Sequence, residues 1–272
     1  MKKTLYVSDL DGTLLRCDQT ISPFTAQTLH ALTEKGMLFS YATARSLVTA
    51  SKVTLGLSVN IPVITYNGAF VMESKTGKRL ISHVFSKDEA TRILNTCLCH
   101  EVMPIVFSLA DEKERFCYIA EKESRGAKAF LATRKEDFRR QPVLYKEALY
   151  EGEIFHITCI DEKEKLVPLY EEFKEEFPCV FERDLYSGEQ WLEFHPCGAT
   201  KAEAILHLKE YLGCERVVCF GDGKNDIPMF EVADEAYAMA NADAELKKIA
   251  TSVIGCHEDD GVAKWLLSHV VK

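Results

Sequence analysis

Apolar and polar positions follow two different patterns along the chain. Near both ends, compact apolar runs of strand length are separated by stretches of helix length; the runs are TLYVSDL, MLFSYATA, IPVITYNG, RVVCFGDG and EAYAMA. Apolar runs that alternate with helices predict βαβ units. Strands without polar alternation also indicate a parallel sheet covered on both faces. The pattern therefore favours an α/β fold.

Helices are predicted between these strands. In the first helix, Ser22 can act as the N-cap, Pro23 fits the first turn, and Gly36 ends the helix. Its apolar face would consist of Phe24, Leu29 and Leu32. Three later helices are expected, over TKAEAILHLKEYLG closed by Gly213, over IPMFEVA, and over DDGVAKWLLSHV opened by Asp260.

The middle of the chain has a different, charge-rich pattern. Helix-like stretches at 86–101, 122–136 and 162–176 alternate with short strands such as MPIVFSL, FHITCI and QWLEF. This change predicts a second, α+β unit inserted into the first. We expect a core domain formed by residues 1–85 and 191–272, and an inserted domain at 86–190.

Composition and charge narrow the classes of partner. The chain has 272 residues, is 47% hydrophobic and carries a net charge of −9. A field of this sign repels nucleic acid and anionic lipid, so neither is an expected partner. The apolar start of MKKTLYVSDLDG reaches Asp9 too soon for a signal peptide, and no run approaches the length of a membrane span. We expect a soluble, cytoplasmic protein, either a monomer or a homodimer.

Ten cysteines are scattered along the chain without a CxxC pair. Several lie in apolar runs, where cysteine behaves as a small hydrophobic residue. We interpret them as structural thiols of a reducing compartment, in preference to a disulfide framework or a metal site.

Polar residues gather where the predicted strands end. They are DLDGT after the first strand, TAR (residues 43–45) after the second, Lys201 at the start of a helix, and GDGKND after RVVCF. Ligands of open α/β sheets bind beyond the carboxyl ends of the strands. These four segments are therefore expected to meet at one site.

The carboxylates predict a metal ion at this site. Residues i and i+2 of an extended chain face the same side, so Asp9 and Asp11 can point into one site, and Gly12 allows a sharp turn. With Asp222 and Asp226 converging on them, the group stays ionised most simply around a hard cation with oxygen ligands, which favours Mg²⁺. The alternative is that both loops are ordinary polar turns.

These four ordered segments resemble the motifs of the haloacid dehalogenase (HAD) superfamily, and the whole chain, through MANADAELKKIA and EDDGVAKWL, resembles its Cof-like phosphatases. The sequence departs from the family pattern where Ala44 and Ala202 stand in place of glycine. The resemblance implies a Rossmann-like, doubly wound parallel core. About 158 residues separate Thr43 from Lys201, which is the position of a type-two cap, and the pattern of the insert resembles the C2B subtype. A lid of this kind excludes water and contacts the leaving group.

The resemblance also implies a mechanism. Asp9 would attack phosphorus and become an aspartyl phosphate, and Asp11 would act first as general acid and then as general base. Mg²⁺ would be held by the Asp9 carboxylate, the Asp11 backbone carbonyl and Asp222, with Asn225 and Asp226 supporting them. The phosphoryl oxygens would contact Thr43 and Lys201, and the further substrate-binding residues would be Gly12, Ala44, Arg45 and Asn225. Physical chemistry agrees, because a dianion cannot approach a carboxylate until cations cancel the repulsion.

The expected function is thus Mg²⁺-dependent hydrolysis of a small phosphorylated metabolite, such as a sugar phosphate. A phosphosugar mutase, a receiver domain and a non-catalytic phosphometabolite-binding protein are the alternatives. A dehalogenase would need neither Asp11 nor magnesium. Several other residues are interpreted as packing, surface or turn residues, namely Asn67 with Gly68, His195, Trp191 and Tyr186.

Overall fold

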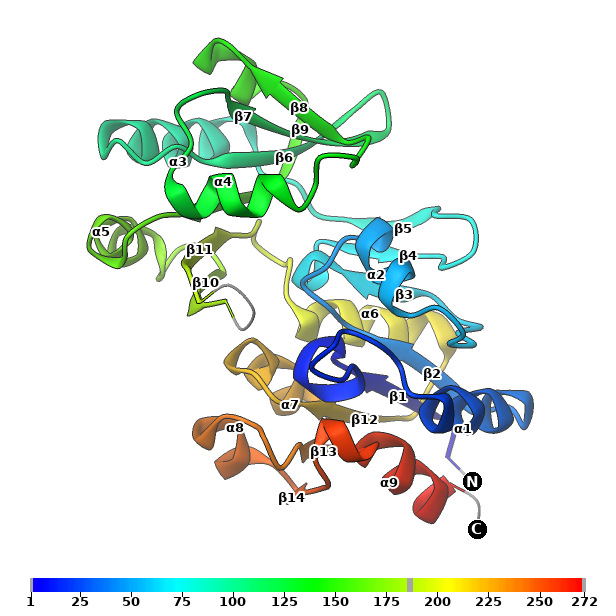
Figure 1. The fold of residues 1–272 in the computed structure, drawn as a ribbon. Coiled ribbons are helices and arrows are strands. Elements are labelled where there is room, and N and C mark those ends of the chain that lie inside the picture. The colour runs from blue at the N-terminus through cyan, green and yellow to red at the C-terminus, as the bar shows by residue number, and fades with distance from the viewer. Residues whose placement is uncertain (1, 185–187, 271–272) are drawn as a thin grey trace. The chain divides into compact units, whose positions relative to one another are not determined.

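The structure is a computed structural model that describes residues 2–184 and 188–270. It contains two compact units, Met1–Ser82 with Ala199–Lys272, and His83–Gly198 (Figure 1). The second unit is thus an insertion into the chain of the first. Its last strand, β11 (Gln190–Phe194), pairs with β10 (Cys179–Arg183). This pairing explains why the unit extends past residue 190, the limit set by the sequence pattern.

A five-stranded parallel sheet forms the centre of the first unit (Figure 1). Its order is β14 (Ser252–Val253), β13 (Glu235–Ala238), β12 (Arg216–Gly221), β1 (Thr4–Ser8) and β2 (Leu38–Tyr41). From the central pair, α1 (Pro23–Glu34) leads outward to β2, and α7 (Ile227–Val232) leads the other way to β13. Right-handed crossovers in opposite directions place these helices on opposite faces of the sheet. The unit is therefore a doubly wound, Rossmann-like α/β fold, as expected.

The structure of α1 confirms the predicted cap and two of the three residues of the predicted apolar face. Ser22 Oγ accepts a hydrogen bond from the Thr25 N–H at 2.9 Å. Leu29 and Leu32 are buried, whereas Phe24 is 41% exposed, so its assignment to the buried face was wrong. In the first turn the buried side chain is Thr25 instead.

Asp260 connects two helices. It directly precedes α9 (Gly261–Val270), as predicted, and its carbonyl accepts the Lys264 N–H at 3.0 Å. Its carboxylate instead accepts hydrogen bonds from Ser22 Oγ and, at 2.9 Å, from Thr25 Oγ1. The side chain therefore holds the start of α1 near the start of α9.

The run IPVITYNG does not become a regular strand of the parallel sheet. Its β3 (Val63–Thr65) pairs antiparallel with β4 (Phe70–Met72), which pairs with β5 (Arg79–Ser82). A single parallel bridge, from Ala42 to Ile64, joins it to the segment after β2. The reason is the turn at Asn67 and Gly68, whose φ values of 53° and 107° reverse the chain at once.

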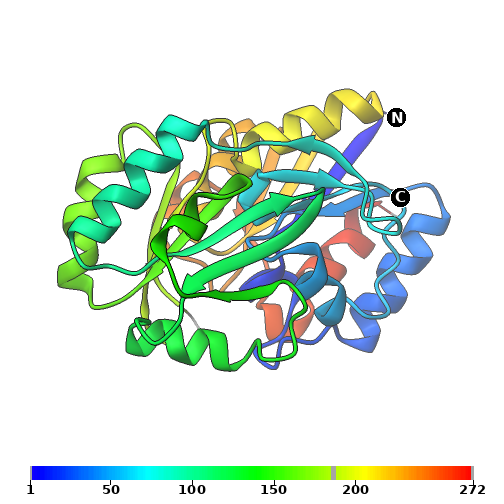
Figure 2. The same cartoon turned by 90° about the horizontal axis from the view of Figure 1, so that it is seen from above.

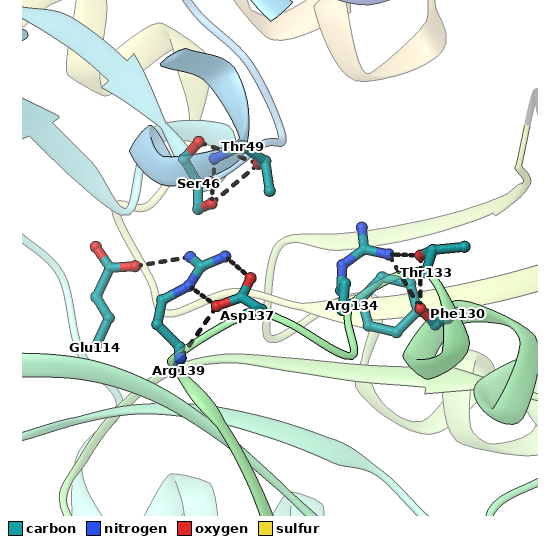
Figure 3. Close-up of polar contacts among 8 residues, drawn as sticks. All are labelled: Ser46, Thr49, Glu114, Phe130, Thr133, Arg134, Asp137 and Arg139. Carbon is teal, nitrogen blue, oxygen red and sulfur yellow. Dashed lines mark hydrogen bonds and ion pairs between the residues drawn. The ribbon is translucent and has the colours of Figure 1, made fainter. Parts of the chain in front are cut away.

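The remaining helices of the first unit have clear ends. Ser46 caps α2 (Leu47–Val53) by accepting the Thr49 N–H at 3.1 Å (Figure 3). Thr200 caps α6 (Lys201–Leu212), which ends at Gly213 with φ 62°. The last helix before α9 is α8 (Ala244–Ile249). The core of this unit contains Leu5, Phe39 and Phe220, all fully buried.

The second unit contains a six-stranded sheet, and two of its helices pack together on one face of it (Figures 1 and 2). The strand order is β10, β11, β9 (Glu153–Ile160), β6 (Ile105–Ala110), β7 (Lys113–Ile119) and β8 (Arg140–Val143). All its pairs are antiparallel except β7 with β8. Leu94 of α3 (Lys87–Cys99) and Leu169 of α5 (Lys163–Phe173) pack on the sheet in one apolar cluster. The helix α4 (Arg125–Ala132) completes the predicted set.

Several polar and aromatic side chains of this unit have structural contacts. Arg139 is buried and pairs with Asp137 at 2.6 Å and Glu114 at 3.1 Å (Figure 3). The Trp191 ring packs edge-on against Phe130, with ring centroids 5.1 Å apart. His195 is also buried, 3.8 Å from Glu193. The predicted packing roles of Trp191 and His195 agree with these contacts, whereas Tyr186 lies outside the described residues.

The cysteines are all free thiols, and their burial is mixed. Five are buried, namely Cys97, Cys117, Cys159, Cys214 and Cys219, and these fit the predicted structural role. Cys17, Cys99 and Cys197 are exposed. The interpretation as core residues is therefore wrong for those three, which lie outside the strands; Cys99 is the last residue of a helix.

Candidate active site

The ends of β1 and β12 place two carboxylates at one edge of the sheet. The strands pair in parallel with Ser8 opposite Phe220, and the Asp9 N–H donates to the Phe220 carbonyl at 2.9 Å. Asp9 and Asp222 are the first residues after their strands. The chain leaves this central pair in opposite directions, and a doubly wound sheet opens its ligand crevice at such a switch point.

Lys201 links this edge to the first turn of α6. Its ammonium lies 2.6 Å from Asp9 Oδ1 and 2.7 Å from Asp226 Oδ1. All three residues are buried, with exposed fractions of 2%, 6% and 0% for Lys201, Asp9 and Asp226. A buried ammonium is tolerated when paired and hydrogen-bonded in this way. Residues separated by almost the whole chain thus form one charged cluster.

The cluster carries more negative than positive charge. Carboxylate oxygens of Asp9, Asp222 and Asp226 lie within 4.8 Å of one another. Burial raises the pKa of Asp9 well above its usual range; Lys201 opposes this shift, and the other carboxylates add to it. Burial, followed by repulsion from Asp226, raises the pKa of Asp222 to about 7. Burial acts to lower the pKa of Lys201, but the Asp226 and Asp9 carboxylates outweigh it and raise that pKa.

Asp226 organises the loop after β12. Its Oδ2 accepts the backbone N–H groups of Asp222 at 2.8 Å and Gly223 at 3.0 Å, while Oδ1 faces Lys201. Both oxygens are therefore engaged by the chain itself. Asp222 is held in turn by Thr13, whose hydroxyl donates to Asp222 Oδ1 at 2.8 Å. Sequence reasoning did not identify Thr13, although it belongs to the DLDGT segment.

Gly12 is required by the close approach of these two loops. Its φ is 74°, and a Cβ there would lie 2.2 Å from Asp222 Oδ2. Any side chain would displace the Asp222 carboxylate or the turn. The glycine of DLDGT thus provides space as well as backbone freedom.

Asp11 lies in an irregular turn that follows β1. β1 ends at Ser8, and Leu10–Leu14 form an irregular helical turn. Asp9 and Asp11 nevertheless keep extended backbone angles, with φ −64° and ψ 163° at Asp9 and φ −72° and ψ 121° at Asp11. The Asp11 carboxylate is bound at both oxygens by Arg45, at 2.7 and 2.6 Å, and its charge contributes to the raised pKa values of Asp9 and Asp222.

The segment after β2 brings Thr43, Ala44 and Arg45 to this edge. Thr43 is fully buried, and its Oγ1 accepts the Arg45 N–H at 3.1 Å. Ala44 is exposed, so its substitution for glycine meets no obstacle. Arg45 is mostly buried and forms an ion pair with Asp11.

Asn67 and Gly68 also belong to this edge. The Asn67 N–H donates to the Thr43 carbonyl at 2.9 Å, and Asn225 Nδ2 donates to Asn67 Oδ1 at 3.4 Å. A Cβ on Gly68 would lie 2.2 Å from the Thr200 carbonyl oxygen, just before α6. The sequence suggested only a turn at these two residues. The signal that could have placed them at the site was an Asn-Gly pair directly after an apolar strand.

The structure also bears on the expected absence of a membrane segment. Across residues 2–184 and 188–270, no helix is both long and apolar enough to span a bilayer.

Comparison with known proteins identifies relatives along the whole chain. The sequence model of the haloacid dehalogenase-like hydrolases matches residues 6–266. The 5-amino-6-(5-phospho-D-ribitylamino)uracil phosphatase YwtE of Bacillus subtilis is 27% identical, with 95% of each chain covered. The pyridoxal phosphate phosphatase YbhA of Escherichia coli is 25% identical, with 97% of each covered. Among solved structures, TM0651 of Thermotoga maritima has a TM-score of 0.80 at 26% identity, covering 98% of this chain and 97% of its own.

These matches agree with the geometry of the site, in which the four ordered segments come together in the first unit. The family model extends over nearly all of the chain, and the relatives match from end to end. The chain therefore belongs to the haloacid dehalogenase-like hydrolases, and it is a phosphoric monoester hydrolase of their Cof-like branch.

Proposed function

We propose that the protein is a Mg²⁺-dependent phosphatase of small phosphorylated metabolites and that Asp9 is its nucleophile. The observation that carries this proposal is the buried Lys201 ammonium, held between Asp9 and Asp226 beside Asp222. A cation in contact with a carboxylate nucleophile is what the approach of a phosphate dianion requires, because the two anions otherwise repel each other.

The donor set fits a hard divalent cation. Lys201 pairs with Asp9 and Asp226, and Asp222 lies beside them. Burial, and after it the neighbouring carboxylates, raise the pKa values of Asp9 and Asp222. Oxygen ligands of this type suit magnesium. We propose that Asp9, Asp222 and the backbone carbonyl of Asp11 hold the ion. Both oxygens of Asp226 already accept hydrogen bonds, from Lys201 and from the loop backbone, so Asp226 would hold the loop in place and not the ion. Asn225, which donates to Asn67, would hold the same loop.

When bound, the magnesium ion would neutralise charge on the phosphoryl group and beside Asp9. The other steps belong to side chains. Asp9 attacks phosphorus and forms an aspartyl phosphate while the alkoxide departs. Asp11 gives the alkoxide its proton, then takes a proton from the water that hydrolyses the intermediate. Arg45 holds Asp11 through both oxygens and so orients it for these transfers.

The remaining residues of the site would bind the phosphoryl group. Lys201 supplies positive charge, and the Thr43 hydroxyl can donate its hydrogen, since its oxygen already accepts the Arg45 N–H. Ala44, Gly12 and Asn225 would contribute backbone or amide groups from neighbouring loops. Together these groups stabilise the negative charge that spreads over the phosphoryl oxygens during transfer.

The substrate class follows from the relatives. YwtE and YbhA are named for a phosphoribityl-aminouracil and for pyridoxal phosphate, which are both small phosphate monoesters. We propose a substrate of this type, and a sugar phosphate belongs to the same class. The experiment is a screen of phosphorylated metabolites by release of free phosphate, with and without magnesium. Release that depends on Mg²⁺ would support the proposal. Transfer of phosphate to a product without release would overturn it.

We further propose that the inserted unit, His83–Gly198, is a cap that selects the substrate. Its charge-rich sequence differs from the core, and a lid excludes water during phosphoryl transfer. Exchange of this unit for that of a relative should transfer substrate preference. Unchanged preference in the chimera would contradict the assignment.

A further inference from the structure

A second group of metal-ligand side chains lies in the first unit, apart from the carboxylate cluster. It consists of Cys17 Sγ, His257 Nε2 and Glu258 Oε1, all within 4.8 Å of one another. Cys17 lies in the turn that follows Leu10–Leu14, and the other two residues begin the 3₁₀ turn before α9. Cys17 and Glu258 are exposed, and His257 is partly buried. The group is therefore accessible to a metal ion from solvent.

The distances within the group match a tetrahedral site. Cys17 Sγ lies 3.3 Å from His257 Nε2, and His257 Nε2 lies 3.6 Å from Glu258 Oε1. Around tetrahedral zinc, the usual bond lengths give ligand separations of about 3.5 Å for sulfur to nitrogen and about 3.4 Å for nitrogen to oxygen. The three atoms can thus bind one ion with only small movements.

Neighbouring contacts hold the ligands in this arrangement. Glu258 Oε1 accepts the Cys17 N–H at 2.6 Å, which fixes the carboxylate beside the thiol. Asn241 Oδ1 accepts the His257 N–H at 3.3 Å and lies 3.5 Å from Cys256 Sγ. Cys256 Sγ is 3.6 Å from the other ring nitrogen, His257 Nδ1. Contacts to the second nitrogen orient a histidine ligand, as around many metal sites.

We propose that Cys17, His257 and Glu258 bind a zinc ion, separate from the hard-cation site at Asp9. A thiolate with an imidazole and a carboxylate selects a borderline-soft cation, whereas the oxygen-only cluster does not. On binding, the Cys17 thiol loses its proton to solvent and a metal–sulfur bond forms. The carboxylate of Glu258 remains as a ligand, and water completes the tetrahedron.

The ion would connect two segments that flank the active site. Cys17 continues the loop that carries Asp11, and Asn241 Nδ2 donates to the Gly12 carbonyl at 2.8 Å. Zinc at this position would hold the segment that follows Leu10–Leu14 close to His257–Asp259, the 3₁₀ turn before α9. The site depends on its own ligands and stands independently of the proposed phosphatase function.

Cobalt(II) is the direct probe, because cobalt bound by a thiolate has a sulfur-to-metal charge-transfer absorption in the near ultraviolet. The full-length protein is titrated with Co²⁺ in excess Mg²⁺, which occupies the carboxylate site. That site contains no sulfur and cannot produce the absorption. We expect one equivalent of absorbing Co²⁺, displaced by Zn²⁺. No charge-transfer absorption in the wild type would overturn the proposal.

Variants test the assignment to these residues. Cys17→Ser should abolish the absorption, and His257→Asn should weaken Co²⁺ binding at least tenfold. Cys99 is an exposed cysteine of the other unit, so Cys99→Ser is the matched control and should bind Co²⁺ as the wild type does. Thermal unfolding provides a second measurement, since Zn²⁺ should raise the midpoint of the wild type and of Cys99→Ser more than that of Cys17→Ser. Absorption retained in Cys17→Ser, or equal shifts in all three proteins, would refute the site.

Discussion

Replacing Lys201 with methionine tests the charged cluster, because it keeps most of the side-chain volume and removes the charge. The ammonium lies 2.6 and 2.7 Å from two buried carboxylates. At an effective dielectric near 20, each contact is worth about 6 kcal/mol before desolvation is subtracted. Removing one partner of a buried ion pair typically costs about 3–5 kcal/mol. For a unit of this size, such a loss lowers the unfolding midpoint by roughly 10 °C.

Activity should fall further than stability alone would explain. Loss of one preorganised group that stabilises transition-state charge reduces kcat by about 100-fold to 1,000-fold. The stability deficit should also depend on pH. Lys201 lowers the pKa of Asp9, so its stabilising effect is present at higher pH and is lost as the carboxylate becomes protonated. The difference in midpoint between Lys201→Met and the wild type should therefore shrink as the pH falls.

The assays are differential scanning calorimetry without metal at several pH values, and phosphate release with magnesium. Lys209→Met is the matched control, because Lys209 lies on the same helix and forms only a partly exposed pair with Asp234 at 3.7 Å. Such a pair contributes about 1 kcal/mol or less. A Lys201→Met protein with a midpoint like that of the control, and with activity within tenfold of wild type, would refute the reasoning.

Three further predictions concern the same cluster. Gly12→Ala should weaken activation by magnesium at least tenfold, because the new Cβ would lie 2.2 Å from Asp222 Oδ2. Gly36→Ala is the control and should leave activation unchanged, because Gly36 also has a positive φ but a Cβ there would meet no atom within 4 Å. Because the pKa of Asp222 is raised from 3.8 to about 7, its contribution to metal-free stability is complete below pH 4 and lost as the pH rises through 7. Magnesium competes with the proton on Asp222. Scanning fluorimetry should therefore show that Mg²⁺ raises the unfolding midpoint more at pH 8 than at pH 5.5. Equal increases at the two pH values would contradict this. Chelation should abolish phosphate release, and added magnesium should restore it; activity that survives exhaustive chelation would exclude a metal requirement.

Much of the core was predictable from the sequence because its signals are local. The N-cap of α1 at Ser22 and the end of α6 at Gly213 are determined by residues at the helix ends themselves, and the structure contains both. The apolar runs identified β1, β2, β12 and β13, and parallel pairing followed from the alternation with helices. The residues at the strand ends could be expected at one edge because parallel strands share a direction.

The details that failed depend on contacts distant in sequence. Phe24 has the spacing of a buried residue, but it is 41% exposed while the adjacent Thr25 is buried. The Asp11–Arg45 pair depends on how the irregular turn after Ser8 directs the side chain, which spacing alone does not determine. Thr13 and Asn67 gain their roles only when the loops after β1, β3 and β12 come together.

The most direct test of the central proposal is to trap phosphate on Asp9. With p-nitrophenyl phosphate the leaving group is a stable anion, so Asp11→Asn should still form the intermediate with magnesium but lack the base that hydrolyses it. Quenching, borohydride reduction and peptide mass spectrometry should then find homoserine at position 9, with one nitrophenolate released rapidly per enzyme. Nitrophenolate release with an unmodified Asp9, or modification at another residue, would contradict the account.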